Sequence, residues 1–401
     1  MFRFCSFLVL SLVFAIATAR ADFSDGVIKI GVLTDLSGPY AAPTGEGSVL
    51  AARMAVEDFA PAAKGMKVEI VVGDLHGKPE AAAALVKQWY ETDKVDAVVD
   101  VPNTAVALAV NQLTRGTNKA LLLSGTASSD MTGKACSPNL VHWTYDTWAQ
   151  ANAIGTVTVL TGGKNWFFVT VDHPFGQAFQ RDIQSAVLST GGEVVGSATH
   201  PFNNPDFSPM LKAAQASKAK IIALANAGGD TNNAIKRAAE LGIGKSYGQQ
   251  LAGMLVNEYD IHKLGLGVTQ GILVANSFYW DLNPRTRLWS KKFYEKRKAM
   301  PNMIQAGVYA SVLHYLKAAE QLQSDDGLKV VAKMKAMPTN DPLFGFGRIR
   351  DDGRKVHRLY LFEVKKPTES RGDWDYYKLR GIVPVDTAFR SLKDGGCPLV
   401  K

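Results

Sequence analysis

The stretch VIKIGVLTDLSGPYAAPTGEGSVLAARMAVEDF, residues 27–59, decides the fold. Its first eight residues form a mostly apolar run, which predicts a buried strand over 27–34. Residues 46–59 carry apolar side chains at helical spacing, and a polar loop joins the two segments. A strand followed by a helix is the unit from which a parallel sheet covered by helices is built.

The same unit recurs from here to residue 124, so the first third of the chain alternates between strands and helices. This alternation predicts a parallel sheet with helices on both faces. Further strands are expected at 67–74, 95–101 and 119–124, with helices at 79–91 and 104–115.

The alternation breaks at residues 142–150 and then restarts, which predicts a second α/β lobe after the first. Three helical stretches follow residue 284 without partner strands of their own, and they need a sheet that is already built, most simply that of the first lobe. The chain would then cross between the lobes more than once, with 142–150 and 276–284 as hinge strands, as in a two-lobed clamp. The second lobe is expected to hold strands 165–171, 193–200 and 219–226, helices 176–190, 207–218 and 231–242, and strands near 250–256 and 271–276. The late helices are expected at 285–299, 305–321 and 328–337, and a hairpin with its turn at 351–353 is expected over 344–365.

The first 21 residues are typical of a secretory signal peptide. Arg3 precedes an apolar run over 4–16, and Ala19-Arg20-Ala21 forms a small-x-small cleavage site. The run is too short to span a bilayer, so export into the periplasm is favoured over a membrane anchor. Cys5 lies inside this run and is not placed to become a lipidated N-terminus.

Two cysteines remain after the expected cleavage, Cys136 and Cys397. An even pair in an oxidising compartment favours a disulfide between them. The alternative is two separate buried thiols.

Charge and motifs exclude several functional classes. The formal net charge is +8, but Lys and Arg are spread along the chain, so no nucleic-acid partner is expected. The Gly45-x-Gly47 pair lies too far from its strand for a dinucleotide loop, and no Walker A motif or nucleophile elbow is present in the sequence. None of the seven histidines pairs with another at ligand spacing. We therefore expect a protein that is not an enzyme and has neither cofactor nor metal.

Polar loops follow three of the strands expected in the first lobe, at 34–47, 102–105 and 124–130. The carboxyl ends of parallel strands are where such sheets bind ligands. Ser, Thr and Asn there are first of all helix caps, but the last loop, SGTASSD, has more hydroxyls than one cap needs. Free amides and hydroxyls at a helix N-terminus suit a carboxylate.

The second lobe presents DHPFGQ at 172–177 and ANAGGDTNN at 225–233 at the equivalent strand ends. His173 either contacts ligand or lies at the surface, and Asp230 either contacts ligand or caps a helix. Aromatic residues of the hinge segments either pack between the lobes or line the cleft, and alternate members of 278–280 are expected to face it. The candidates for a ligand-binding role are Tyr40, Asn103, Thr104, Thr126, Ala127, Ser128, Tyr145, His173, Phe175, Asn226, Asp230, Phe278 and Trp280.

Four stretches together resemble the periplasmic substrate-binding proteins of ABC transporters, of the leucine/isoleucine/valine-binding type. They are IKIGVLTDLSGPYAAPTGEGSVLAARMAVED, SGTASSDMTG, DHPFGQAFQRD and FGFGRIRDDGRKVHRLYLFEVK. The resemblance implies an α/β fold of two Rossmann-like lobes joined by three hinge crossings, with the ligand closed between them. It implies a monomer that delivers its ligand to a membrane permease. The expected division is 22–143 plus 279–345 for the first lobe, and 144–278 plus 346–401 for the second.

The resemblance also implies how the ligand is held. Thr126 would offer its backbone, Ser128 its hydroxyl and amide, and Asn103 or Thr104 a further donor to a ligand carboxylate. Amino-acid binders of this family place a tyrosine and an acid near the ammonium, whereas this chain has Ala227 and Gly228 where bulky aromatics are common.

The loss of these side chains widens the cleft and removes the obvious ammonium partner. ANAGGDT, with VDVPN and VHWTYDT, resembles the branch that binds aromatic acids. We therefore expect a small carboxylate, an aromatic acid, as ligand. The alternatives are an amino acid, an amide or urea, a sensory protein of the same fold, or an exported α/β enzyme.

Overall fold

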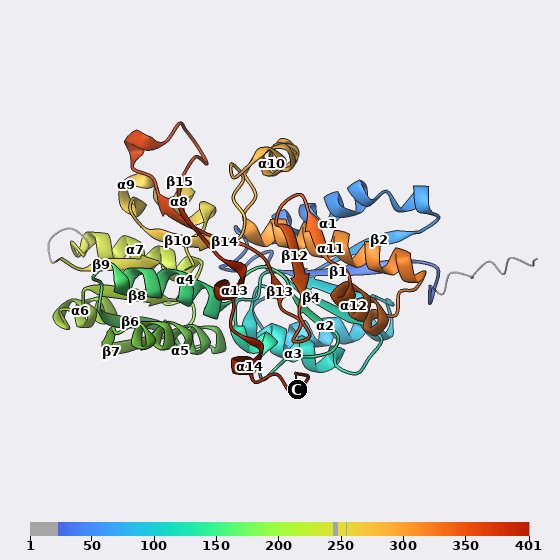
Figure 1. Cartoon of the computed structure of the whole chain (residues 1–401), viewed down its shortest axis with the longest axis horizontal. Coiled ribbons are helices and arrows are strands. Elements are labelled where there is room, and N and C mark those ends of the chain that lie inside the picture. Colours follow the sequence, from blue (N-terminus) through green and yellow to red (C-terminus); the bar gives the residue numbers. More distant parts are fainter. Residues whose placement is uncertain (1–22, 244–247, 254, 401) are drawn as a thin grey trace, which may run out of the picture.

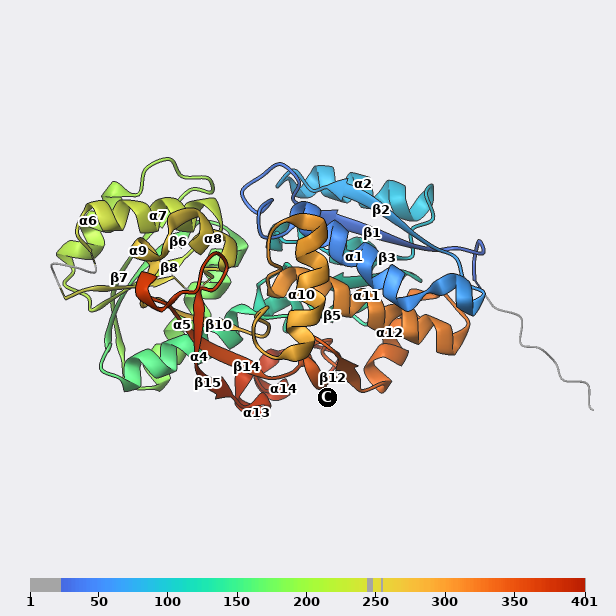
Figure 2. The ribbon, with the colours of Figure 1, turned by 90° about the horizontal axis from the view of Figure 1, so that it is seen from above.

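The structure, a computed structural model, describes residues 23–243, 248–253 and 255–400. The expected signal peptide and Cys5 lie outside this range. Figures 1 and 2 show two groups of helices and strands side by side, with a thinner region of chain crossings between them. We refer to the group that begins the described chain as the first lobe and to the other as the second lobe.

The first lobe is built on a five-stranded parallel sheet, as the sequence predicts. The inner strands β3 and β4 are four residues long and fully buried, because helices cover both faces, whereas the edge strand β2 is only partly buried. Across the sheet the strands are β2 (Val68–Asp74), β1 (Ile28–Thr34), β3 (Ala97–Asp100), β4 (Ala120–Leu123) and β5 (Leu140–His142).

Side chains of these strands alternate between two apolar layers. Val99 packs in the layer that holds α1 (Gly45–Phe59) and α11 (Met303–Leu322), while Val98 packs in the layer that holds α2 (Pro79–Glu91) and α3 (Thr104–Thr114). This alternation is the period of two expected of a strand buried on both sides.

The helices that follow residue 284 do return to the first lobe, which confirms that expectation. Helix α11 packs against α1, β3 and β4, and α10 (Pro284–Arg297) and α12 (Gly327–Ala336) flank it. All residues of α11 from 303 to 316 are buried, as in a helix that is enclosed on every side.

The second lobe repeats the plan with a four-stranded parallel sheet. Helices α4 and α5 pack together on one face, and α6 and α7 lie on the other. The strand order is β7 (Glu193–His200), β6 (Asn165–Val171), β8 (Ile221–Ala225) and β9 (Gln250–Gly253). The helices are α4 (Thr147–Leu160), α5 (Pro174–Ser189), α6 (Ser208–Ala216), α7 (Gly229–Glu240), α8 (Glu258–Leu264) and α9 (Leu266–Thr269).

Three crossings join the lobes, at 143–146, 277–283 and 357–358. The expectation of hinge strands at 142–150 and 276–284 is wrong, because β5 ends at His142 and α4 already begins at Thr147. Asp146 caps α4 by accepting the amide of Ala149, and this stops the extended segment early.

Two small antiparallel sheets complete the chain near the crossings. The expected hairpin forms only in part: its turn lies at 350–353, but the second strand breaks after two residues and its continuation joins another sheet. One sheet contains β10 (Leu273–Asn276), β14 (Leu359–Val364) and β15 (Tyr377–Val383), and the other contains β11 (Thr339–Asp341), β12 (Gly345–Ile349) and β13 (Lys355–Val356). The remaining short helices are η1 (Pro61–Lys64), η2 (Ser129–Thr132), η3 (Pro367–Glu369), α13 (Val385–Ala388) and α14 (Leu392–Gly395).

Arg354 ties the first crossing to the turn that precedes β13. Its side chain is fully buried and donates to the carbonyl oxygens of Thr144 at 2.8 Å and Tyr145 at 3.1 Å. It also forms a buried ion pair with Asp146, with 3.5 Å between Nη1 and Oδ2. The guanidinium thus compensates several buried polar groups at once, as a buried charge must.

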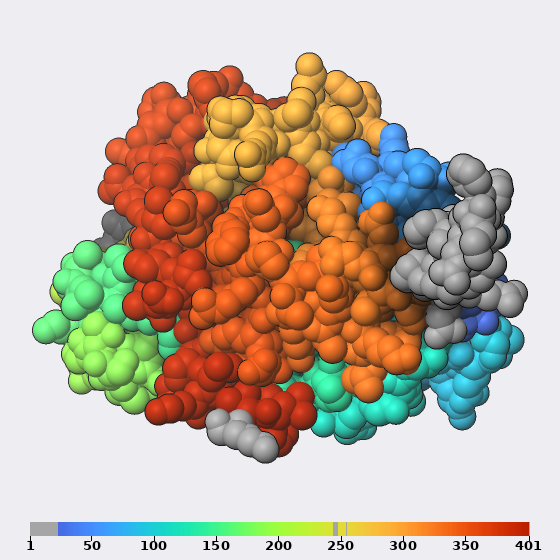
Figure 3. All heavy atoms as spheres, turned by 45° about the vertical axis from the view of Figure 1, so that its right-hand side comes forward, coloured from blue at the N-terminus to red at the C-terminus, as the bar shows by residue number. Residues whose placement is uncertain are grey.

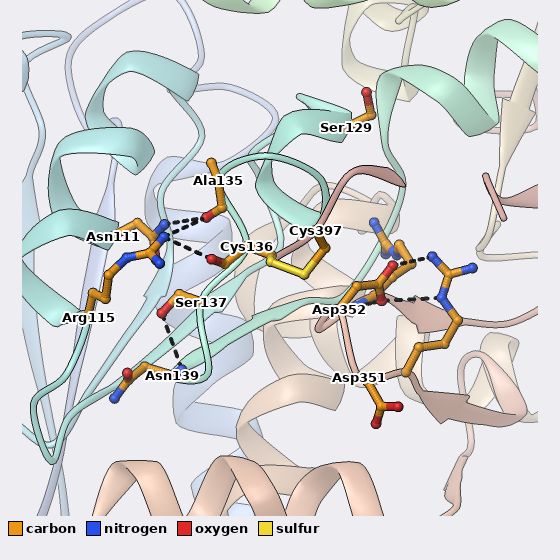
Figure 4. The surroundings of a disulfide bond; sticks show 12 residues. Asn111, Arg115, Ser129, Ala135, Cys136, Ser137, Asn139, Asp351, Asp352 and Cys397 are labelled. Atoms are coloured by element: carbon orange, nitrogen blue, oxygen red, sulfur yellow. Dashed lines mark hydrogen bonds and ion pairs between the residues drawn. A yellow bond between two sulfur atoms is a disulfide. The ribbon is translucent and has the colours of Figure 1, made fainter. Parts of the chain in front are cut away.

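The expected disulfide is confirmed, and Figure 4 shows Cys136 bonded to Cys397. The bond fastens the C-terminal segment, red in Figure 3, to the loop that follows η2 in the first lobe. Nearby, Arg390 donates to the carbonyl oxygen of Ser129 at 2.9 Å. The lobe boundaries given above stay a prediction, and these contacts tie the last residues to the first lobe rather than to the second.

Candidate functional site

A cavity lies between the lobes at the carboxyl ends of the parallel strands, where such sheets bind ligands. Its empty volume is about 670 Å³, a figure that includes the space at its opening to solvent. First-lobe and crossing residues in the lining are Tyr40, Pro43, Thr44, Pro102, Thr104, Gly125, Ala127, Tyr145, Met303 and Ile304. Residues of the second lobe and of β10 in the lining are Gln150, His173, Phe175, Ala227, Gly228, Leu255, Val256, Asn257, Ala275 and Asn276.

The turn after β4 forms the first-lobe wall with its backbone. Gly125 and Ala127 line the cavity, and the carbonyl oxygen of Ala127 accepts the amide of Thr147 at 2.7 Å. The amides of residues 126, 127 and 128 have no hydrogen-bond partner within the described chain, although all three residues are buried. A buried N–H needs a partner, and Ala127 lies in the cavity lining, so its amide is a donor available to an occupant of the cavity, whereas Thr126 and Ser128 lie outside the lining.

Asp100, the last residue of β3, holds the turn after β4 in place. Its carbonyl oxygen accepts the amides of Ser124 and Gly125, and its carboxylate accepts the Thr34 hydroxyl at 2.8 Å. A Cβ on Gly125 would lie 2.7 Å from the Asp100 carboxylate, so glycine is required at this close approach. Burial raises the pKa of Asp100 to about 7.

Backbone strain accompanies this arrangement. Asp100 has a φ of 83° and Val101 a φ of 51°, a conformation that is costly for a β-branched residue. Directly after these two residues, Pro102 and Thr104 at the start of α3 lie in the cavity lining. Helix α3 thereby directs the positive end of its dipole at the cavity, which favours an anion.

The second-lobe wall of the cavity consists of side chains, with open space beside the small residues Ala227 and Gly228. His173 caps α5, because its Nδ1 accepts the amide of Phe175 at 3.2 Å. That bond leaves Nε2 as the protonated nitrogen of the neutral ring, and burial lowers the pKa of His173. Its ring stacks on Phe202, with 5.7 Å between the centroids, and both His173 and Phe175 line the site from this lobe.

Gly228 brings the lobes together at the mouth of the cavity. It has a φ of 59°, and a Cβ there would lie 2.8 Å from the carbonyl oxygen of Pro39 in the first lobe. Tyr40 and Phe202 also meet across this gap, with ring centroids 5.9 Å apart. The contact requires glycine both for its backbone angle and for space.

A second contact between the lobes lies around Asp182 of α5. Its carboxylate accepts the Ser129 hydroxyl at 2.5 Å and the Thr147 hydroxyl at 2.6 Å. Beside it, Arg181 pairs with Asp130 at 3.1 Å. With contacts at Gly228 and at Asp182, the lobes are closed on the cavity in this structure.

A buried acid lies behind the second-lobe wall, next to the lining residue Asn257. Both carboxylate oxygens of Glu258 are buried without a partner in the described chain. Burial raises the pKa of Glu258 to about 8, so this carboxyl is largely protonated at neutral pH.

The structure brings some of the expected site residues together and places others elsewhere. Those that line the cavity are Tyr40, Thr104, Ala127, Tyr145, His173 and Phe175. The remaining residues lie outside the lining, because each is used in local structure or in packing.

Among these, Asn103 caps α3 by accepting the amide of Val106, and Ser128 accepts the amide of Asp130. The Thr126 hydroxyl donates to the carbonyl oxygen of Val101. Asp230 accepts the amides of Asn203 and Asn204. These are the capping and turn roles that such residue types most often have.

The aromatic and amide candidates are also engaged. Phe278 packs fully buried against Trp289, and the Trp280 indole donates to the carbonyl oxygen of Trp374 at 2.7 Å. Asn226 bonds with His200 and Thr231. The expectation that alternate members of 278–280 face the cleft is wrong, because these residues lie in no strand and pack into the cores.

Sequence reasoning missed several lining residues. Gln150, Met303 and Ile304 lie in helices whose apolar spacing is that of ordinary core helices, so no signal marks them. Leu255 and Asn257 follow β9, and the rule that ligands bind at strand ends would have found them.

The lining has a distinctive charge pattern. Among its described residues there is no Asp, Glu, Lys or Arg. His173 is the one member of a residue type whose reference pKa lies near neutrality. In the described ranges, no group of three or more His, Cys, Asp or Glu is arranged to hold a metal ion. A fixed negative charge for a ligand cation is therefore missing from the described lining.

Comparison with known families gives a clear result. Residues 27–372 match the model of a family described as periplasmic binding protein. This chain belongs to the periplasmic binding protein family. Members are non-enzymatic receptors that bind small solutes for ABC transporters.

Solved structures agree with this assignment. A periplasmic binding protein from Burkholderia mallei is 41% identical, with a TM-score of 0.91, over 94% of this chain and 100% of that one. A branched-chain amino acid ABC transporter ligand-binding protein from Burkholderia xenovorans is 35% identical, with a TM-score of 0.84, over 93% and 100%. A solute-binding protein from R. palustris in complex with benzoate is 20% identical, with a TM-score of 0.79, over 89% and 96%. A search of curated proteins finds no match.

The α/β fold with two parallel-sheet lobes is therefore the fold of this family. Across the described ranges, every helix is too short or too polar to cross a membrane.

Proposed function

We propose that this receptor binds a small carboxylate, an aromatic acid, and delivers it to an ABC permease. The observation that carries the proposal is the turn after β4, where Ala127, whose amide has no partner in the described chain, lines a cavity without a charged side chain in its described lining. A carboxylate satisfies several N–H donors at once, and the N-terminus of α3 adds a favourable field.

The rest of the lining supports an apolar, planar body for the ligand. Tyr40, Tyr145 and Phe175 supply aromatic faces, and Ala227 and Gly228 leave room between them. Desolvating an ammonium here would be costly, because the described lining provides no anion to pair with it. The benzoate-bound R. palustris structure is similar at the level of the fold, so the argument for an aromatic acid depends on this lining.

A second candidate ligand is a branched-chain or aromatic amino acid. The name of the Burkholderia xenovorans relative favours it. The absence of an acidic side chain from the described lining argues against an amino acid, since an amino acid carries an ammonium as well as a carboxylate.

A calorimetric panel tests the proposal. Benzoate is expected to bind, while benzamide, which has the same ring but no charge, should bind at least tenfold more weakly, a difference of about 1.4 kcal/mol. Leucine, phenylalanine and urea are expected not to bind measurably. Tight binding of leucine or phenylalanine together with no binding of benzoate would overturn the aromatic-acid assignment and favour the second candidate.

We further propose that residues 1–21 are removed on export, that the mature chain is a periplasmic monomer, and that its lobes divide at the boundaries given above. The apolar run over 4–16 and the disulfide both suit an exported chain. N-terminal sequencing of the exported protein should begin at Asp22, and light scattering should report one chain. A dimer, or an intact leader, would contradict these points.

A further inference from the structure

Gln150 is a buried amide with one unused atom in the wall of the cavity. Its side chain is 1% exposed, and its Nε2 donates to the carbonyl oxygen of Ala275 at 2.7 Å. Its Oε1 is buried and has no partner in the described chain. Both Gln150 and Ala275 line the cavity.

The bond to Ala275 fixes which atom is left over. A carbonyl oxygen can only accept, so the amide must present nitrogen to Ala275 and keep its oxygen for another partner. A buried acceptor without a partner costs about 1–3 kcal/mol, and an occupant of the cavity that donates a hydrogen bond would recover this.

Gln150 also lies close to the proposed carboxylate position. Thr147, the first residue of α4, donates its amide to the carbonyl oxygen of Ala127 at 2.7 Å, and Gln150 is one turn further along the same helix. A ligand held by the amide of Ala127 would therefore have its other atoms beside Gln150, which lines the same cavity. On the other side of the amide, β10 leads into the second crossing, so Gln150 also joins α4 to the strand that precedes that crossing.

We infer that Gln150 is a specificity residue that accepts a hydrogen bond from a hydroxyl group of the ligand, so that hydroxylated acids are selected over acids without that group. The inference rests on the proposed function and narrows its substrate class. A hydroxyl can also accept, and Asn276, which follows Ala275 in the lining, has a buried Nδ2 without a partner in the described chain. A neutral hydroxyl suits these two amides, since neither carries the charge that an ammonium would need.

The test compares benzoate with its three monohydroxy derivatives by calorimetry. At least one hydroxybenzoate should bind the wild-type protein tenfold or more tightly than benzoate, because benzoate leaves Gln150 Oε1 unpaired. In Gln150→Met, which keeps the length of the side chain but removes its oxygen, that ratio should fall to within about twofold of one.

Gln249 provides a matched control. It is buried, its Nε2 donates to the carbonyl oxygens of Ala214 and Ala219, and its Oε1 has no partner in the described chain, but it lies outside the cavity lining. Gln249→Met should lower the melting temperature, as Gln150→Met does, yet leave the ratio of the two affinities at its wild-type value.

Three results would overturn the inference. If the wild-type protein binds all four acids with affinities within a factor of three of one another, the inference is contradicted without any variant. That result would mean that a trapped water donates the hydrogen bond to Gln150 Oε1. A ratio that survives Gln150→Met would place the hydroxyl elsewhere. If none of the four acids binds, the proposed function fails first and this inference fails with it.

Discussion

The two walls of the cavity are built in different ways. The first-lobe wall combines the backbone of the turn after β4 and a helix N-terminus with the side chains of Tyr40 and Tyr145, and it is held by Asp100 and by the buried guanidinium of Arg354. The second-lobe wall consists of aromatic and imidazole side chains beside a space left by Ala227 and Gly228. Backbone donors have a fixed geometry that suits a group common to many ligands, whereas side chains can change without altering the fold. The comparison therefore suggests that the first lobe fixes the ligand class and the second lobe selects among its members.

The largest expected effect comes from removing Arg354, which supports the first-lobe side of this comparison. Arg354→Met leaves Asp146 and two carbonyl oxygens without their partner, and should lower the free energy of unfolding by about 3–5 kcal/mol. Urea unfolding followed by tryptophan fluorescence measures this. Arg287→Met, at a half-exposed ion pair, is the control and should change stability little. Equal effects of the two variants would show that Arg354 does not support the crossing.

The disulfide is the second support of the first lobe. It closes a loop of 261 residues, so replacing Cys136 and Cys397 by serine should lower the free energy of unfolding by about 2–4 kcal/mol. The reduced wild-type protein should lose stability by the same amount, whereas the serine variant should be insensitive to reductant. Affinity for benzoate is expected to stay unchanged, because neither cysteine lines the cavity.

Gly228 tests the second wall. In Gly228→Ala the new methyl group would meet the carbonyl oxygen of Pro39, so closure of the lobes is hindered and affinity for benzoate should fall about tenfold, or 1.4 kcal/mol. Gly191→Ala is the matched control, since Gly191 also has a positive φ of 87° but a Cβ there meets no atom within 4 Å. Both variants should lose some stability, and only the first should lose affinity. Equal affinities in both would mean that this contact does not form in the bound state.

The smallest effect concerns pH and Glu258, the buried acid behind the second wall. A carboxyl whose pKa is raised on folding to about 8 makes the folded state less stable as pH rises from its unfolded pKa, near 4.5, to about 8. Glu258→Gln removes this titration, so the fall in unfolding free energy between pH 6 and pH 7 should shrink by about 1 kcal/mol. Below pH 4 the pH dependence of variant and wild type should coincide. A parallel pH profile over the whole range would show that Glu258 is charged in the folded protein.

The sequence was sufficient to predict the alternating strands and helices of both lobes, because buried strands and amphipathic helices have distinct periods. It also predicted that α10–α12 return to the first sheet, since these helices have no partner strands of their own and need an existing sheet to pack against. The extended hinge segments were predicted wrongly, because the cap at Asp146 starts α4 within the polar stretch.

The site was harder to predict than the fold. Polar loops at strand ends led to Tyr40, Thr104, Ala127, Tyr145, His173 and Phe175, which share the cavity. Sequence cannot distinguish a cap such as Asn103 from a ligand contact, since both need the same side chain. Nor could it reveal Gln150, whose unused oxygen is defined only by its bond to a residue 125 positions away.

The disulfide has a consequence for the order of biogenesis. Cys397 comes after every helix and strand of both lobes in the described chain, and its partner, Cys136, lies in the first lobe. The covalent link can thus form only once nearly all of the polypeptide has been translocated. The first sheet likewise lacks α11 and α12 until residues up to 336 have emerged, so a chain truncated before them would present an uncovered apolar face to chaperones and proteases.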